Sequence, residues 1–72
     1  MDRNYEDLAN AIVVQAARDY REAAKILKRN PKNSVAEYTK KEVERFFFSS
    51  WYKVLTNLDP VYLLERLKEE NE

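Results

Sequence analysis

The stretch FFFSSWY, residues 46–52, places five aromatic rings in seven positions. Successive residues of an α-helix turn by about 100°, so three consecutive phenylalanines cannot share one face. Extending the helix in both directions gives one apolar face, made of Val43, Phe47, Trp51, Val54 and Leu58. We therefore predict that most of these rings form the core of a helical protein, with Trp51 near its centre.

Phe46 and Tyr52 do not fit on this face. In a straight helix Phe46 projects about 100° to one side of Phe47, and Tyr52 about 140° to the other. They could cover the edges of the bundle, since folded surfaces are largely apolar, and a bend at Ser49–Ser50 would change both directions. They could also form a contact for another protein, because interfaces are enriched in aromatic residues. We predict Phe46 and Tyr52 as protein-interaction residues.

The composition indicates an all-α fold. The 72 residues include no glycine and only two prolines, at positions 31 and 60. A β-rich fold of this size would need glycine at its turns, whereas strong helix formers dominate here. We expect one compact domain over residues 1–72, near the lower size limit for a core of its own.

Two prolines mark the outer helices. Pro31 cannot continue a helix, which predicts a long first helix over about residues 5–29, with Asn30 in the left-handed conformation after it. Asp59 followed by Pro60 is typical of a helix start, which predicts a third helix over about residues 60–69.

The middle helix has less definite limits. Ser34 with Glu37 and Thr39 with Glu42 are successive capping boxes. Either residues 35–38 form an extra helical turn, or the second helix starts early. We predict a main helix over about residues 40–56, with a possible bend at Ser49–Ser50, and hence a three-helix bundle.

Asp19 lies in the apolar stripe of the first helix. Ala9, Ala16 and Ala23 recur every seven residues there, a seam that would let large side chains of the second helix approach. A carboxylate in that seam is costly unless it is hydrogen-bonded. We predict Asp19 as a buried polar residue bonded to Trp51, a tyrosine hydroxyl or a helix N-terminus. The alternative is that the stripe is partly open and Asp19 faces a partner.

The residues that usually carry catalysis are missing. The chain has no histidine and no cysteine, and it has no glycine-rich phosphate loop or zinc-ligand spacing. We expect no enzyme activity, no catalytic residue, no metal and no cofactor. The longest apolar run is far below the roughly 20 residues that span a bilayer, and residues 1–8 lack a signal-peptide pattern. We expect a cytoplasmic protein without a membrane partner.

Charge is balanced overall but uneven along the chain. The net charge is zero, with segments of −2 over residues 1–17, +4 over 18–45 and −2 over 46–72. If the first two helices are antiparallel, one end of the bundle gathers the basic residues Lys25, Lys28, Arg29, Lys32, Lys40 and Lys41. These residues could contact the phosphates of a nucleic acid. Complementarity to the helix dipole is the simpler explanation, and we prefer it.

Two segments carry a resemblance: AIVVQAARDYREA (residues 11–23) and VERFFFSSWYKVLTNLDPVYLLERLKEE (residues 43–70). They resemble small uncharacterised helical accessory proteins of phages and integrative elements of Gram-positive bacteria. The matching positions are Tyr20, Phe46, Phe47, Ser49, Trp51, Leu55, Thr56, Leu58, Asp59 and Leu67. Relatives often have glycine where this chain has Pro60, and a basic residue near Phe48. The resemblance implies an accessory protein in a bacterial host cell, without a defined activity.

We therefore expect a non-enzymatic protein-interaction module that binds a host or element protein. One alternative is nucleic-acid binding through the basic end. The other is self-association, since small bundles often hide apolar surface in a homodimer.

Overall fold

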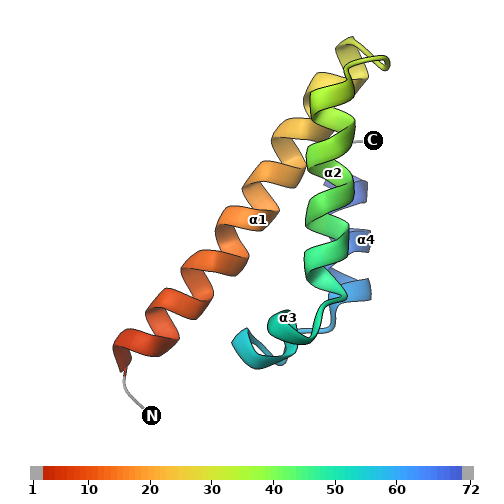
Figure 1. Cartoon of the computed structure of the whole chain (residues 1–72). Coiled ribbons are helices and arrows are strands. Elements are labelled where there is room, and N and C mark those ends of the chain that lie inside the picture. Colours follow the sequence, from red (N-terminus) through yellow and green to blue (C-terminus); the bar gives the residue numbers. More distant parts are fainter. Residues whose placement is uncertain (1–2, 71–72) are drawn as a thin grey trace.

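The computed structural model describes residues 3–70. Over this range the chain forms four helices and no strand (Figure 1). The helices are α1 (Arg3–Arg29), α2 (Ser34–Phe47), α3 (Ser50–Leu55) and α4 (Pro60–Glu70). The predicted all-α fold is confirmed, and three longer helices form a rough three-helix bundle to which the short α3 is added.

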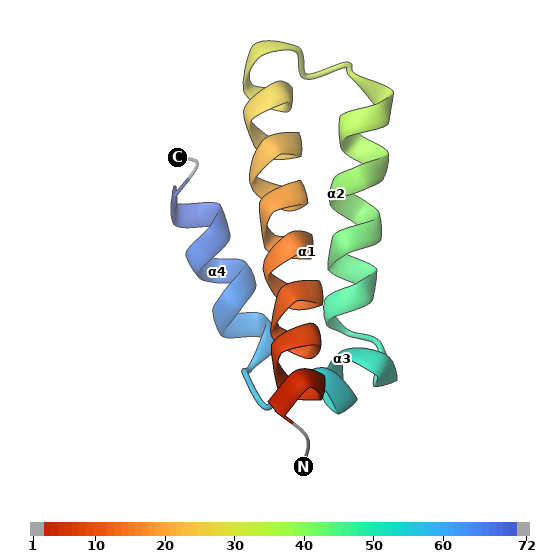
Figure 2. The ribbon, with the colours of Figure 1, turned by 90° about the vertical axis from the view of Figure 1, so that its left-hand side faces the viewer.

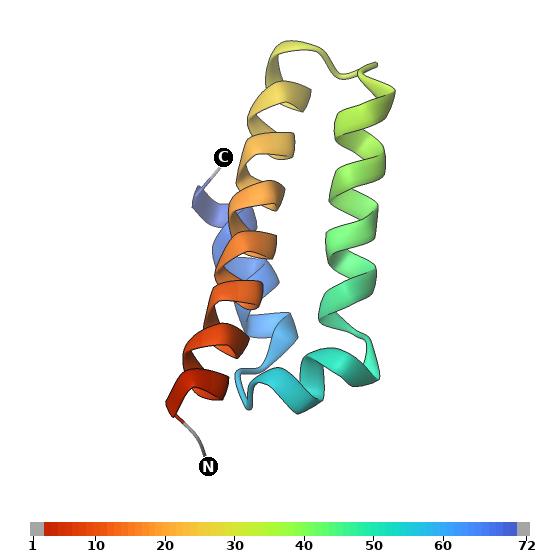
Figure 3. The ribbon, with the colours of Figure 1, turned by 60° about the vertical axis from the view of Figure 1, so that its left-hand side comes forward.

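The two longest helices form an antiparallel hairpin. They are joined by a short turn at one end and move apart towards the other, where α3 crosses the base of the hairpin (Figures 1 and 3). Helix α4 packs against one side of the hairpin (Figure 2). The 27 residues of α1 give a helix about 40 Å long, which accounts for the longest dimension of 43 Å.

The turn between α1 and α2 is held by asparagine side chains and backbone bonds. The backbone N–H of Asn30 donates to the carbonyl oxygen of Ile26 at 2.8 Å, and the backbone N–H of Asn33 donates to the carbonyl oxygen of Asn30 at 3.0 Å. No described residue has a positive φ, so the prediction of a left-handed Asn30 is wrong. Asn33 caps α2, because its side chain accepts from the Ala36 amide at 2.9 Å. This cap starts α2 at Ser34, so the predicted start at 40 is wrong and the alternative of an early start is confirmed.

Ser49 divides the predicted second helix into two. Its backbone is extended, with φ −82° and ψ 160°. Its Oγ accepts from the Tyr52 amide at 3.2 Å and donates to Phe46 O at 2.6 Å. One side chain therefore bonds the end of α2 and the start of α3, so a continuous helix over 40–56 is wrong and the bend at Ser49 is confirmed.

The core lies where α1, α2, α3 and α4 meet. Its largest fully buried side chains are Tyr20, Phe47, Tyr52 and Leu67. The alanine seam of α1 allows this approach: Ala9 and Ala23 are buried, while Ala16 is half-buried.

Helix α4 begins as its sequence predicts. Asp59 Oδ1 accepts from the Val61 amide at 2.9 Å, and Pro60 is the first helical residue. The helix buries Leu64 and, one turn later, Leu67 in the shared core.

Candidate functional site: an apolar groove between α1 and α2

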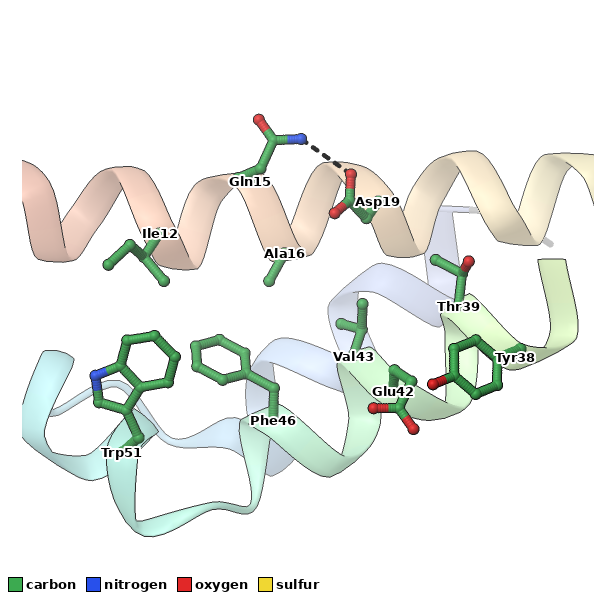
Figure 4. Close-up of a pocket in the computed structure, with 10 residues that line it drawn as sticks. All are labelled: Ile12, Gln15, Ala16, Asp19, Tyr38, Thr39, Glu42, Val43, Phe46 and Trp51. Carbon is green, nitrogen blue, oxygen red and sulfur yellow. Dashed lines mark hydrogen bonds between the residues drawn. The ribbon is translucent and has the colours of Figure 1, made fainter. Parts of the chain in front are cut away.

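A groove of about 440 Å³ opens between α1 and α2 (Figure 4). Its apolar wall is formed by Ile12 and Ala16 of α1, Val43 and Phe46 of α2, and Trp51 of α3. Helix α4 lies behind these residues, so the groove opens on the side of the hairpin that α4 leaves uncovered. We call it the apolar groove.

The groove exists because the hairpin is closed at only one end. Near the turn, α1 and α2 pack side by side, and towards the base they diverge (Figures 1 and 3). The crossing helix α3 brings Trp51 to the base of the gap, where the indole and Phe46 face Ile12 and Ala16 (Figure 4). The methyl side chain of Ala16 is too small to fill the space between α1 and the two aromatic rings.

Phe46 and Trp51 form a paired aromatic rim, which we call the aromatic ledge. Their ring centroids are 5.7 Å apart and the ring planes meet at 75°, an edge-to-face arrangement that aromatic pairs favour. Phe46 also packs at 5.8 Å against both Phe47 and Tyr52, which are buried. The ledge is therefore fixed to the core on one side while its outer side remains open.

The predicted roles of Trp51 and Tyr52 are wrong, and the two residues exchange places. Trp51, predicted in the core, is 56% exposed, whereas Tyr52, predicted as a contact, is 1% exposed. The Tyr52 hydroxyl donates to Leu58 O at 2.9 Å. The extended residue Ser49 interrupts the 100° progression of the helix, so Tyr52 and not Trp51 follows Phe47 into the core. Ser49, a residue type that favours the N-cap position, was the signal for this exchange.

Phe46 was predicted as a protein contact, and its side chain is half-buried. It lines the apolar groove. Its role as a contact for another protein stays a prediction.

Asp19 is not a buried polar residue. Its side chain is exposed, accepts from Gln15 Nε2 at 2.9 Å and lines the apolar groove (Figure 4). The prediction failed because the buried side of α1 centres on Tyr20 and Ala23, which leaves the flank with Asp19 open. The geometry agrees with the alternative interpretation, in which the apolar stripe is only partly covered.

The predicted basic end is only partly assembled. Lys25, Lys28, Arg29 and Lys32 are exposed around the α1–α2 turn. Lys40 Nζ lies 5.7 Å from the centroid of the Tyr20 ring. The remaining lysine, Lys41, is 3.4 Å from Glu37 in an ion pair. Glu37 and Glu44 therefore lie among the lysines of α2, and phosphate binding there stays a prediction.

Two buried phenols have altered acidity. Burial, together with the negative charge of nearby Glu44, raises the pKa of Tyr20 to about 12. Within residues 3–70, no atom meets hydrogen-bond geometry with the Tyr20 hydroxyl, although Glu44 lies close enough to raise the pKa of that phenol. Burial, and secondarily the charge of Asp59, raises the pKa of Tyr52. Both phenols hold their protons more firmly than usual, which is unsuited to proton transfer near neutral pH.

Within residues 3–70, no group of three or more acidic side chains is arranged to hold a metal ion. In the same part of the chain, none of the helices combines the length and apolar character needed to cross a bilayer. Comparison with protein-family models, with curated proteins and with solved structures finds no match to this chain.

Proposed function

We propose that this chain is a non-enzymatic protein-interaction module that binds its partner in the apolar groove, against the aromatic ledge. The single tryptophan of the chain carries the proposal, because it is 56% exposed at the rim of an apolar groove. Tryptophan is among the residues most enriched at the energetic centres of protein interfaces.

Burial of Trp51 by a partner would contribute substantially to the free energy of binding. A tryptophan side chain buries 150–250 Å² when fully covered. Covering the exposed part of Trp51 would remove on the order of 110 Å² from water, which stabilises a complex by roughly 2–3 kcal/mol. The packing of Phe46 against buried rings keeps the ledge ordered before binding, so little further ordering is needed.

The resemblance to phage and mobile-element accessory proteins suggests what kind of partner to seek. We propose that the module occupies a surface of a host or element protein in the bacterial cytoplasm. Carboxylates among the lysines of α2 favour this function over nucleic-acid binding, for which an uninterrupted basic surface would be more suitable.

A pull-down with a matched control tests the proposal. Trp51→Ser removes the ledge, and Tyr62→Ser removes a similarly exposed aromatic from α4, outside the groove. We expect the wild type and Tyr62→Ser to retain the same protein from nuclease-treated bacterial lysate, and Trp51→Ser to lose it. Circular dichroism checks that all three chains are folded. A partner retained equally by Trp51→Ser would show that the groove is not the contact surface.

A further inference from the structure

We infer that the partner segment is an amphipathic helix with a bulky apolar face flanked by Lys and Arg. This inference rests on the proposed function and specifies the chemistry of its partner. It comes from the length of the groove and from the charges along it.

The apolar groove continues into a second hollow, and the two together have the length of a helix. The second hollow, of about 420 Å³, shares Asp19 and Thr39 with the first and extends along α1 to Ile26. The distance along α1 from Ile12 to Ile26 is about 21 Å, the length of a helix of about 14 residues. A helix placed there would lie against α1 and α2 on the side opposite α4, a common way of binding a peptide.

All charged side chains lining the two hollows are acidic. Asp19 and Glu42 line the first, and Asp19 and Glu22 line the second, with no Lys or Arg among the described lining residues. Among residues 3–70, the Asp19 carboxylate is hydrogen-bonded to the neutral side chain of Gln15 and to no charged group. Glu42 lies 3.2 Å from Arg45, but the Arg45 side chain is 78% exposed, and such surface pairs are weak and easily exchanged. The rim is therefore complementary to a basic helix and repels an acidic one.

A second copy of this chain fits the groove less well. In a symmetric dimer the same surface of both copies meets, which would place one acidic rim against the other. The short amphipathic helix α4 does not supply the missing charge either, because Glu65, Glu69 and Glu70 outnumber Arg66 and Lys68. The geometry points to a basic helix from another protein.

The test uses two synthetic helical peptides of about 18 residues, long enough to form a helix when stabilised by a side-chain staple. Both have the same face of Leu and Phe; one carries Lys on the flanks and the other Glu. Neither contains tryptophan, so the fluorescence of Trp51 reports binding at the ledge. At low salt, we expect the Lys peptide to bind at least about tenfold more tightly than the Glu peptide. This difference in affinity should shrink as salt is added.

Neutralising the rim separates charge from shape. We expect Asp19→Asn and Glu42→Gln each to lower the ratio of the affinities for the Lys and Glu peptides by about twofold to fivefold. Tyr62→Ser should leave this ratio unchanged. Equal binding of the two peptides would overturn the inference about charge and leave the proposed function standing.

Two other results would also overturn the inference. If neither peptide binds, the groove does not accept a helix, and the pull-down alone decides the proposed function. If sedimentation shows a concentration-dependent dimer that Trp51→Ser abolishes, the groove is occupied by a second copy.

Discussion

Replacing Tyr20 and Tyr52 by phenylalanine should change the stability of the fold in opposite directions. Both residues are 1% exposed, and each substitution removes only the hydroxyl. The two hydroxyls differ in their bonding, since Tyr52 donates to Leu58 O at 2.9 Å, while the buried Tyr20 oxygen has no hydrogen-bond partner among the described residues. Comparing the two variants therefore shows how one hydrogen bond to a buried hydroxyl changes the free energy of unfolding.

The expected magnitudes follow from these two environments. Tyr52→Phe loses a hydrogen bond, which costs about 0.5–1.5 kcal/mol. The bond between Tyr52 and Leu58 is only partly buried, so the lower half of that range applies. Burying a hydroxyl without a partner costs about 1–3 kcal/mol. Tyr20→Phe removes that cost, and we expect the free energy of unfolding to rise by about 1 kcal/mol. At about 4–8 °C per kcal/mol for a domain of this size, the melting temperatures of the two variants should differ by roughly 6–16 °C.

Urea unfolding followed by circular dichroism measures both changes. The fluorescence of Trp51 provides a second probe whose transition should coincide if unfolding is two-state. If Tyr20→Phe lowers stability by more than about 0.5 kcal/mol, the Tyr20 hydroxyl has a partner in solution. Glu44→Gln in the wild-type and Tyr20→Phe backgrounds would then show whether Glu44 is that partner.

The same two residues predict a loss of stability at alkaline pH. The pKa of Tyr20 rises from 10.0 to about 12 in the folded protein, and that of Tyr52 also rises. Their contribution is therefore complete below pH 10, and it declines as the pH rises towards the folded pKa, because only the unfolded chain ionises there. We expect Tyr20→Phe to flatten this decline between pH 10 and 12, and an unchanged profile would contradict the assignment to Tyr20.

Four further substitutions test the fold. Ser49→Ala should cost about 0.5–2 kcal/mol by removing the α3 cap, and urea unfolding with no change would show that the cap is dispensable. Phe47→Ala should cost about 3–5 kcal/mol by opening the core, whereas Trp51→Ala should cost less than about 1; equal losses by the same measurement would contradict the exposure of Trp51. Arg21 lies 2.6 Å from Glu70, and hydrogen bonding to Arg21 lowers the pKa of Glu70 below 4.5. The stability from this pair is therefore present above pH 4.5 and lost as the pH falls further, a trend that acid titration should find weakened in Glu70→Gln.

The end of α1 and the whole of α4 could be predicted because their signals are local. Pro31 stops a helix wherever the rest of the chain lies, and Asp59 with Pro60 forms a cap from its own neighbours. The absence of glycine likewise indicated the all-α class without any contact between distant residues. The start of α2 was missed because Ser34, Thr39 and Asn33 are all acceptable caps, and backbone position decides among them.

The candidate site could be predicted only in part. Phe46 was recognised because three adjacent phenylalanines must point in three directions, a property of any helix. Trp51 and Tyr52 were exchanged because their directions depend on whether Ser49 continues the helix or caps a new one, and both are compatible with the residue type.

The sequence by itself determined an all-α chain, the ends of its outer helices and a surplus of aromatic residues for a core this small. Only the tertiary structure decided which aromatic side chains are left exposed and which flank of α1 is open. The exposure of Trp51 follows from the break at Ser49 and the crossing of α3, and the open flank of α1 follows from the divergence of α1 and α2 (Figure 1). Tyr20, Phe47, Tyr52 and Leu67, one from each helix, are buried together where the four helices meet. Periodicity along one helix predicts the direction of a side chain, but burial requires a neighbour, and only the assembled fold supplies one.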